Sequence, residues 1–452
     1  MTVADFDDPE AWWLDQFRDP ATGVKALRTF FASQRWIHRR VERVSFSDGR
    51  AYLRRISLDT SVPSGCPQVT SPSGIVYSLL PVSLLRKVPL VYFSLETDHG
   101  ASLFNLTLQQ NAAVSFAGLL GIAEATVGAP LSHELIKDIK DLVEDDSTKA
   151  QSARDSIINP DPRAGDICQR RRLKDDGISE WFVRLLAENF LFLIPVEVPI
   201  GSRVVVKYSH AGWDDNDAET RDRWYLVVLE RLGLRASRFL LNVASASTAS
   251  SYHLQIDLPK GVSEESVRLL AKQKDTFSEV QVRRAPGRTP HLVCSRLPLA
   301  QSVRAELRLR PSPIHWIAQS TIAAVGCFAI LALFWWRTSW ALPTHITAGS
   351  SQAVVTALLL ASSSLVATLL TRPGEHGLAS RLVRWLRPVV VTILAMPFLA
   401  SLLVALAFSQ ATIRLAMGVA AAYSAVGASL LCITFSMSLR CERVAKATTG
   451  ES

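Results

Sequence analysis

The segment from residue 210 to residue 219 holds one histidine and four carboxylates within ten residues, a group that could do chemistry. Carboxylates at this density can bind a hard cation such as Ca²⁺. The EF-hand pattern, with its central glycine and terminal glutamate, is absent, so a solvated acidic turn is the simpler interpretation. If the protein were an enzyme, His210 with Asp214 and Asp217 would be the first place to look for its active site. The full group is His210, Asp214, Asp215, Asp217 and Glu219.

Established catalytic motifs are missing from the sequence. It contains no GxxxxGK[ST] phosphate loop, no GxGxxG after a strand-like run and no GxSxG nucleophile elbow. The stretch HELIK begins at His133 like a zinc-protease helix, but Lys137 stands where the second histidine is needed. We therefore predict that the protein is not an enzyme and that it uses no cofactor and no metal.

Four apolar stretches near the C-terminal end predict transmembrane helices. The 21 residues between His315 and Arg337 include no Asp, Glu, Lys or Arg. As a helix they would be roughly 31 Å long, which is the thickness of a bilayer's hydrocarbon core. Three further charge-free stretches follow, and only helices or closed barrels satisfy backbone groups in lipid. We predict a four-helix transmembrane bundle over residues 313–440, with spans at about 316–336, 353–370, 388–408 and 415–439.

Small side chains recur every four residues along the last of these stretches. Such a ridge allows a neighbouring helix to approach closely, so it indicates a helix-packing face. Separately, we consider that the bundle as a whole could form a homo-oligomer. The ridge consists of Ala416, Ala420, Ser424 and Ala428, and continues to Cys432.

Lys and Arg are unevenly distributed on the two sides of the predicted spans. Ten lie on one side, and only Arg337 and Arg414 lie on the other. The positive-inside rule then places both termini, including a short tail at residues 441–452, in the cytoplasm. The prediction is a multi-pass protein of the cell (inner) membrane.

The formal net charge of +8 is concentrated near the membrane. Residues from 311 onward carry 9 Lys and Arg against 3 Asp and Glu, which leaves only +2 for the first 310 residues. The basic excess is placed to meet anionic lipid headgroups, and nucleic acid is an unlikely partner. Within it, Arg381, Arg384 and Arg387 predict a lipid-facing basic segment. This segment is either a short helix on the cytoplasmic leaflet or a plain basic loop.

The first 312 residues predict a cytosolic region in three parts. Residues 1–144 alternate helical and extended patterns and form an α+β region with β-hairpins, one of them turning at Asp48-Gly49. Thr107 and Gln110 form a capping box before an apolar helix. Residues 145–177 are charged and poor in aromatics, which is typical of a linker or mobile loop. Residues 178–312 contain many short strand-like runs and predict a juxtamembrane β-sandwich-like domain.

Three segments resemble parts of uncharacterised actinobacterial integral membrane proteins with four spans and a cytosolic β-rich N-terminal region. The segments are SYHLQIDLPKGV (251–262), LLPVSLLRKVPLVYFSL (79–95) and TDHGASLFNLTLQQN (97–111). The Arg- and Ala-rich composition agrees with this resemblance. It implies a cytosolic β-rich region joined to a membrane bundle, and it implies no activity and no catalytic residue.

These features together predict a membrane-anchored binding or signalling module. The β-rich region would recognise a cytosolic protein partner or ligand, with sheet edges and loops as the docking surfaces. The alternative is an oligomeric channel or transporter that is regulated by its cytosolic domain. The spans hold no ionisable residue that would mark a transport site, although a hydrophobic gate needs none.

Overall fold

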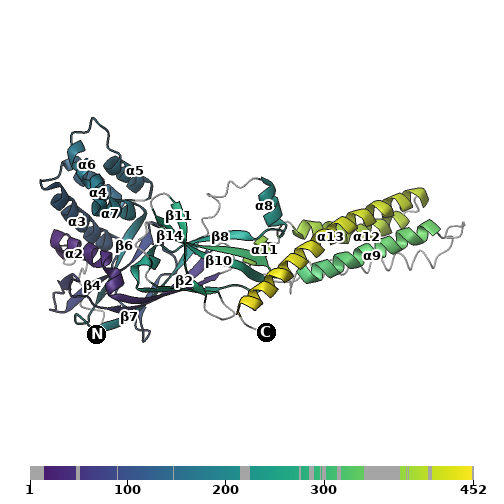
Figure 1. Cartoon of the computed structure of the whole chain (residues 1–452), viewed down its shortest axis with the longest axis horizontal. Helices are drawn as coiled ribbons and strands as arrows, with labels where there is room; N and C mark the ends of the chain where they lie inside the picture. Colours follow the sequence, from purple (N-terminus) through teal and green to yellow (C-terminus); the bar gives the residue numbers. More distant parts are fainter. Residues whose placement is uncertain are drawn as a thin grey trace.

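The computed structural model describes most of the chain from residue 15 to residue 449. The ranges that it does not describe within this span are 47–50, 89, 146, 214–223, 274–275, 285–289, 296, 298–301, 313–316, 341–376, 383, 385 and 406–409. The molecule is elongated, with a helical layer at one end, sheets in the middle and apolar helices at the other end (Figure 1).

Six helices form the helical layer at the end far from the apolar helices (Figure 1). The predicted capping box is confirmed: Thr107 Oγ1 accepts from Gln110 N at 3.2 Å, Gln110 Oε1 accepts from Thr107 N at 2.8 Å, and the helix begins at Leu108. Helix α2 starts differently: Asp19 is its N-cap and accepts from the backbone N–H groups of Ala21 and Thr22, and Pro20 occupies its first position. The helices are α2 (Pro20–Phe31), α3 (Leu108–Val127), α4 (His133–Glu144), α5 (Ser147–Ile158), α6 (Ile167–Asp175) and α7 (Gly177–Glu188).

The strands form three sheets. A seven-stranded sheet has the order β12 (Arg283–Arg284), β13 (His291–Ser295), β9 (Ser251–Asp257), β1 (Ile37–Phe46), β2 (Ala51–Ser61), β7 (Arg203–Trp213), β5 (Ser94–Thr97). A four-stranded sheet has the order β11 (Thr276–Val280), β10 (Val262–Gln273), β14 (Ser302–Pro311), β8 (Ser237–Asn242). A three-stranded sheet has the order β3 (Gln68–Thr70), β4 (Val76–Arg86), β6 (Asn189–Val196).

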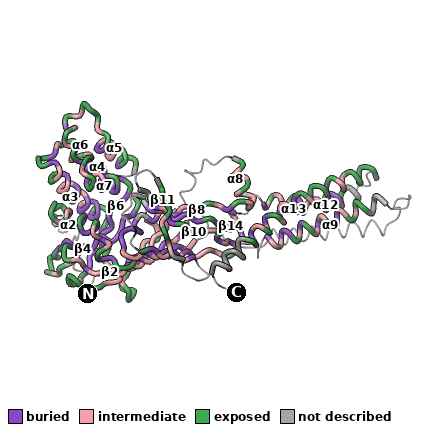
Figure 2. Tube along the Cα trace, viewed as in Figure 1, coloured by how far each residue is buried: buried purple, intermediate pink, exposed green. Residues whose placement is uncertain are grey.

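The two smaller sheets share one face of the seven-stranded sheet. One core lies between the three-stranded and seven-stranded sheets and includes Leu80, Phe192, Ile56 and Tyr208. A second core lies between the four-stranded and seven-stranded sheets. The helical layer covers the remaining face of the three-stranded sheet through a third core. Buried residues are accordingly concentrated where the sheets stack, while the outer faces of the helices are exposed (Figure 2).

The predicted separation of residues 1–144 from a β-sandwich at 178–312 does not describe the fold. Strand β1 pairs in parallel with β9, and β2 pairs antiparallel with β7, so both regions build the same sheet. The β-rich character is correct, but the fold is a mixed α/β arrangement. Local turn signals cannot reveal a parallel pair, because its two strands are far apart in the sequence.

The predicted linker at residues 145–177 is wrong. This range contains helices α5 and α6. Arg170 is only 4% exposed, and its guanidinium contacts Asp138 at 2.5 Å and Asp166 at 2.7 Å. Arg170 and Asp166, two of the charges that suggested a solvated chain, are therefore paired inside the helical layer.

The predicted four-helix transmembrane bundle is also wrong. Among the described residues, only two helices are long and apolar enough to span a membrane, over Ala318–Trp336 and Arg414–Arg440. The third expected span lies in α12 (Leu386–Ala405), where the apolar run Leu386–Ala400 is shorter than the roughly 20 residues that a bilayer needs. The expected span at 353–370 lies outside the described residues.

The helices at this end differ in length from the predicted spans. Helix α9 covers Ala318–Trp340, and α13 covers Gln410–Thr449, which is far longer than the predicted 415–439. A short helix, α11 (Gly377–Leu382), and helix α8 (Trp224–Arg231) lie between the sheets and these helices (Figure 1). We call α9, α12 and α13 the apolar helices.

Helices α2 and α3 pack closely because Gly23 and Gly118 face each other without side chains. A Cβ added at Gly118 would lie 2.6 Å from Gly23 O and 2.8 Å from Leu27 Cδ1. We expect Gly118→Val to lower the free energy of unfolding by about 1–3 kcal/mol or more, because the backbone at Gly23 cannot yield as a flexible side chain would. Thermal melting followed by circular dichroism measures the loss. Gly165→Val is the control, since no atom lies within 4 Å of an added Cβ there, and equal melting of both variants would contradict the prediction.

Candidate binding site

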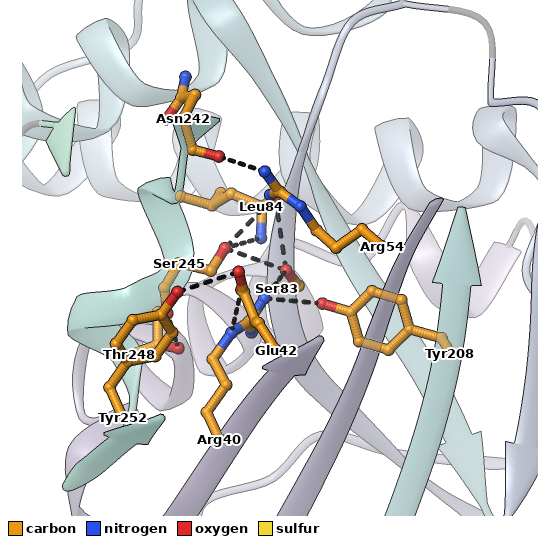
Figure 3. A network of polar contacts seen from close by, with 10 residues as sticks. All are labelled: Arg40, Glu42, Arg54, Ser83, Leu84, Tyr208, Asn242, Ser245, Thr248 and Tyr252. Carbon is orange, nitrogen blue, oxygen red and sulfur yellow. Dashed lines mark hydrogen bonds and ion pairs between the residues drawn. The ribbon is translucent and has the colours of Figure 1, made fainter. Parts of the chain in front are cut away.

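A buried ionic cluster lies where the three sheets meet (Figure 3). Its centre is the carboxylate of Glu42, which is 0% exposed. Arg40 Nε donates to Glu42 Oε1 at 2.8 Å, and Tyr252 Oη donates to Glu42 Oε2 at 3.1 Å. Arg40 Nη2 also donates to Tyr208 Oη at 3.0 Å. These four side chains come from β1, β9 and β7 of the seven-stranded sheet.

The cluster connects this sheet to both smaller sheets. Arg54 Nη2, on β2, donates to Asn242 O at 2.7 Å, at the end of β8 in the four-stranded sheet. Ser83, on β4 in the three-stranded sheet, contacts Ser245 with a 3.0 Å separation between their hydroxyl oxygens. Ser245 Oγ in turn accepts from Leu84 N at 3.0 Å. The polar contacts therefore span the seam between the two smaller sheets.

The protonation states in the cluster follow from its charges. Burial alone would raise the pKa of Glu42, but the positive charges of Arg40 and Arg54 outweigh burial and hold that pKa below its ordinary value of 4.5. Burial, reinforced by the charge of Glu42, raises the pKa of Tyr252 well above 10. Glu42 is thus ionised at neutral pH between two guanidiniums. Since these groups are almost fully buried and are bonded to one another, we assign them a structural role.

His210, which the sequence marked with Asp214 and Asp217 as the first place to look for chemistry, lies beside this cluster. It is half-buried on β7, directly opposite Arg54 on β2. Burial, and then the charge of Arg54, lower its pKa from 6.5 to about 4, so the ring is neutral at pH 7. Asp214, Asp215, Asp217 and Glu219 lie outside the described residues, and the cation site there stays a prediction.

A histidine pair on the seven-stranded sheet was not predicted. His253 Nδ1 and His291 Nε2 are 3.3 Å apart, on β9 and β13. Burial, Arg39 and His291 lower the pKa of His253. Within the described part of the chain, no group of three or more His, Cys, Asp or Glu side chains is arranged to hold a metal ion. A pair beside an arginine is a poor cation site, so we do not assign one.

A groove of about 710 Å³ opens on the helical layer, between α2, α3 and α7. We call it the distal groove, because it lies at the end of the molecule opposite the apolar helices (Figure 1). Its size is in the range of ligand-binding clefts. Its lining residues are Val24, Arg28, Phe31, Ala32, Gln34, Arg35, Gly121, Ile122, Ala125, Thr126, Asp176, Ile178 and Phe182.

The distal groove is apolar with a positive rim. Phe31 and Ile178 are 41% and 50% exposed, which is high for large apolar side chains. Among the described residues, the guanidiniums of Arg28 and Arg35 form no ion pair, whereas Asp176 is engaged as the N-cap of α7 and accepts from Ser179 N at 2.9 Å. The two arginines are therefore the charges that a ligand would meet.

Sequence patterns did not single out these residues, although weak signals existed. Arg28 and Arg35 lie seven residues apart, which is a helical repeat, but the intervening helix ends after Phe31. Arg40 and Glu42 occupy alternate positions with Val44, so the buried face of a strand could have been recognised from this alternation. Neither pattern identifies the partner elements.

The predicted lipid-facing segment is only partly described. Arg384 is exposed and Arg387 is half-buried, and the Arg381 side chain lies outside the described residues. Leu378 and Leu382, which precede and follow the Arg381 position, pack in the core with β10 and β14. The apolar face of α11 is therefore covered by protein, while the contact of the arginines with lipid stays a prediction.

The predicted packing ridge lies mostly inside the apolar helices. Ala420, Ser424 and Ala428 are 7%, 0% and 5% exposed, and Ala416 is half-buried. Gly427, beside the ridge, approaches α12 so closely that an added Cβ would lie 2.3 Å from Ile393 Cδ1. The ridge thus faces neighbouring helices of the same chain, and a homo-oligomer of the protein stays a prediction.

Removing the central carboxylate should destabilise the fold strongly. Glu42→Gln keeps the shape of the side chain but leaves two buried guanidiniums without a counter-charge. We expect a loss of about 3–5 kcal/mol in the free energy of unfolding. Chemical unfolding of the full chain in mild detergent measures it. Asp257→Asn, which removes the solvent-accessible partner of Arg43, should cost less than about 1 kcal/mol, and a similar loss in both variants would contradict the role of the cluster.

The low pKa of His210 predicts a pH-dependent stability. Between pH 6.5 and about 4 the unfolded chain protonates this histidine while the folded chain does not, so acidification favours unfolding. We expect the free energy of unfolding to fall by about 1–2 kcal/mol from pH 7.5 to pH 5.0 through this group. His210→Gln should remove that fall, whereas Ser209→Ala on the same strand should retain it. An unchanged pH profile in His210→Gln would refute the assignment.

Comparisons with known proteins do not indicate a function for the chain. No protein-family model matches the chain, and no curated protein matches it either. The resemblance of residues 79–111 and 251–262 to actinobacterial membrane proteins stays a prediction. The chain's own geometry, with a distal groove, a buried ionic cluster and two helices that could span a membrane, is the basis for assigning it a role.

Proposed function

We propose that this protein is a membrane-attached binding module that recognises a partner through the distal groove. The observation that carries the proposal is the separation of an open, apolar, positively rimmed groove from the apolar helices at the opposite end of the molecule (Figure 1). In this arrangement one end is available to a partner while the other is held in a bilayer.

Membrane attachment is supported by the exposure of the apolar helices. Only 28% of the window Ala318–Trp336 and 39% of the window Arg414–Arg440 are buried, whereas the core helix of a soluble protein is mostly buried. Ile322, Leu415 and Val426 are each more than 70% exposed. An apolar surface of this kind is normally shielded from water, and helices of this length fit the hydrocarbon core of a bilayer. The distribution of Lys and Arg favours the cell membrane, with both termini on the cytoplasmic side.

Close packing joins the sheets to the apolar helices. Leu378, Ala379 and Leu382 of α11 belong to the core of the four-stranded sheet. Leu232, just after α8, packs with the core of α9, α12 and α13, and its carbonyl accepts from Thr434 Oγ1 at 3.4 Å. The sheets are therefore packed against the apolar helices and are not joined to them by a flexible linker alone. This packing supports a module that reports binding to its membrane end.

The alternative is a channel or transporter that is regulated by the sheets. Its support is limited to the buried hydroxyls of Ser320, Ser424 and Ser438, which have no hydrogen-bond partner within the described residues. Unpaired hydroxyls between apolar helices can line a path for ions. The same atoms equally reflect close helix packing, so this alternative is retained as an outcome of the test.

The full chain should retain a partner when it is cross-linked in native membranes and purified in mild detergent. We expect one stoichiometric protein, and we expect the chain to remain in the membrane fraction after an alkaline carbonate wash. The full chain is required, because a piece ending at residue 312 would lose the α11 side chains from its core. A chain that binds nothing but conducts ions in liposomes, with conduction lost in Ala420→Trp or Ser424→Trp, would replace this proposal with the channel.

A further inference from the structure

We propose that the distal groove takes an acidic amphipathic helix from a partner protein. This inference rests on the proposed function and specifies the chemistry of the partner. The apolar floor formed by Val24, Phe31 and Ile178 would receive one apolar face, and Arg28 and Arg35 would pair with carboxylates beside that face.

The shape of the groove favours a helix. Its walls are themselves helices, α2, α3 and α7, so an occupant helix would extend the helical layer by the same ridge-into-groove packing. Along α2 the lining runs from Val24 to Phe31, which is roughly 10 Å, or two helical turns, and the short 3-10 helix Ser33–Arg35 extends it. Phe31 and Ile178 remain about half exposed, whereas a small-molecule site encloses most of its ligand. A peptide face of two to three turns fits such an open trough.

The positive charge at the rim of the groove indicates that the partner helix is acidic. The two rim arginines form no ion pair among the described residues, and the one carboxylate in the lining, Asp176, is already engaged by Ser179 and by Thr126 Oγ1 at 3.4 Å. An acidic side chain would therefore gain charge-assisted hydrogen bonds without displacing an existing pair. A basic helix would instead face two unpaired guanidiniums.

Position excludes a bilayer lipid as the occupant. The distal groove and the apolar helices lie at opposite ends of an elongated molecule (Figure 1). If the apolar helices are in the membrane, the groove is directed away from it. The occupant must therefore be a molecule of the aqueous phase, which agrees with a soluble partner or the soluble part of another membrane protein.

The test measures binding of two matched peptides to the full chain in phosphatidylcholine nanodiscs. One fluorescent peptide of about 18 residues carries leucines on one helical face and glutamates beside them; the second has lysine in place of each glutamate. We expect the acidic peptide to bind at least tenfold more tightly than the basic one, after subtraction of binding to empty nanodiscs. Arg28→Glu with Arg35→Glu should weaken binding of the acidic peptide at least tenfold and reverse the preference.

Two further variants control for net charge and for the apolar surface of the groove. Arg163→Glu with Arg171→Glu changes the net charge equally at exposed positions outside the groove and should leave binding unchanged. Ile178→Glu should abolish binding without disturbing the fold, since this side chain is half exposed. Equal affinity for both peptides, or undiminished binding of an acidic peptide broken by a central proline, would overturn the proposal.

Further results separate this inference from the proposed function. If the variant with Arg28→Glu and Arg35→Glu still retains the cross-linked partner from native membranes, the groove is not the contact, and both this inference and the proposed use of the groove fail. If that variant loses the partner although the wild-type chain binds both peptides equally, the proposed function stands and the acidic helix is refuted. The acidic, tryptophan-containing segment of residues 1–13 could compete for the groove in the same chain. If deletion of that segment raises peptide affinity tenfold, the occupant is the chain's own segment, and the partner helix is refuted.

Discussion

One buried carboxylate, Glu42, holds the arrangement of the three sheets together. It lies between Arg40 and Arg54, and the groups bound to these three side chains come from every sheet (Figure 3). A buried charge is tolerated only when its partners are in place, since an unpaired one costs several kcal/mol. The cluster can therefore form only when the two smaller sheets meet on the seven-stranded sheet in this register. We infer that it contributes more to the uniqueness of the fold than to its net stability.

This constraint has a functional consequence, because the sheets connect the two ends of the molecule. The helical layer packs on the three-stranded sheet, the ionic cluster joins that sheet to the other two, and α11 joins the four-stranded sheet to the apolar helices. Contiguous packed elements of this kind can carry coupling between distant sites. Helices α5 and α6, which occupy residues 145–177, are not part of this path. They add buried charge and apolar surface to the helical layer, in which the groove lies.

Predictions from the sequence succeeded where the signal was local. The capping box at Thr107 and Gln110 specifies the start of α3, because both hydrogen bonds lie within one turn. The pairing of β1 with β2 agrees with the Asp48-Gly49 turn signal, although the turn lies outside the described residues. Predictions failed where composition was used alone. Charged residues suggested a linker at 145–177, but Arg170 finds its counter-charges on α4 and α6, which composition cannot reveal.

The sequence by itself determined the start of α3, the strand-rich character and the apolar nature of α9 and α13, since these depend on neighbouring residues. Only the tertiary structure decided that Glu42 is buried, that β1 lies beside β9, and that Arg28 and Arg35 border an open groove. Tyr252 and Glu42 are 210 residues apart, and Arg54 and Asn242 are 188 apart. No local pattern encodes such contacts, because they form only when hydrophobic burial has brought separate elements together.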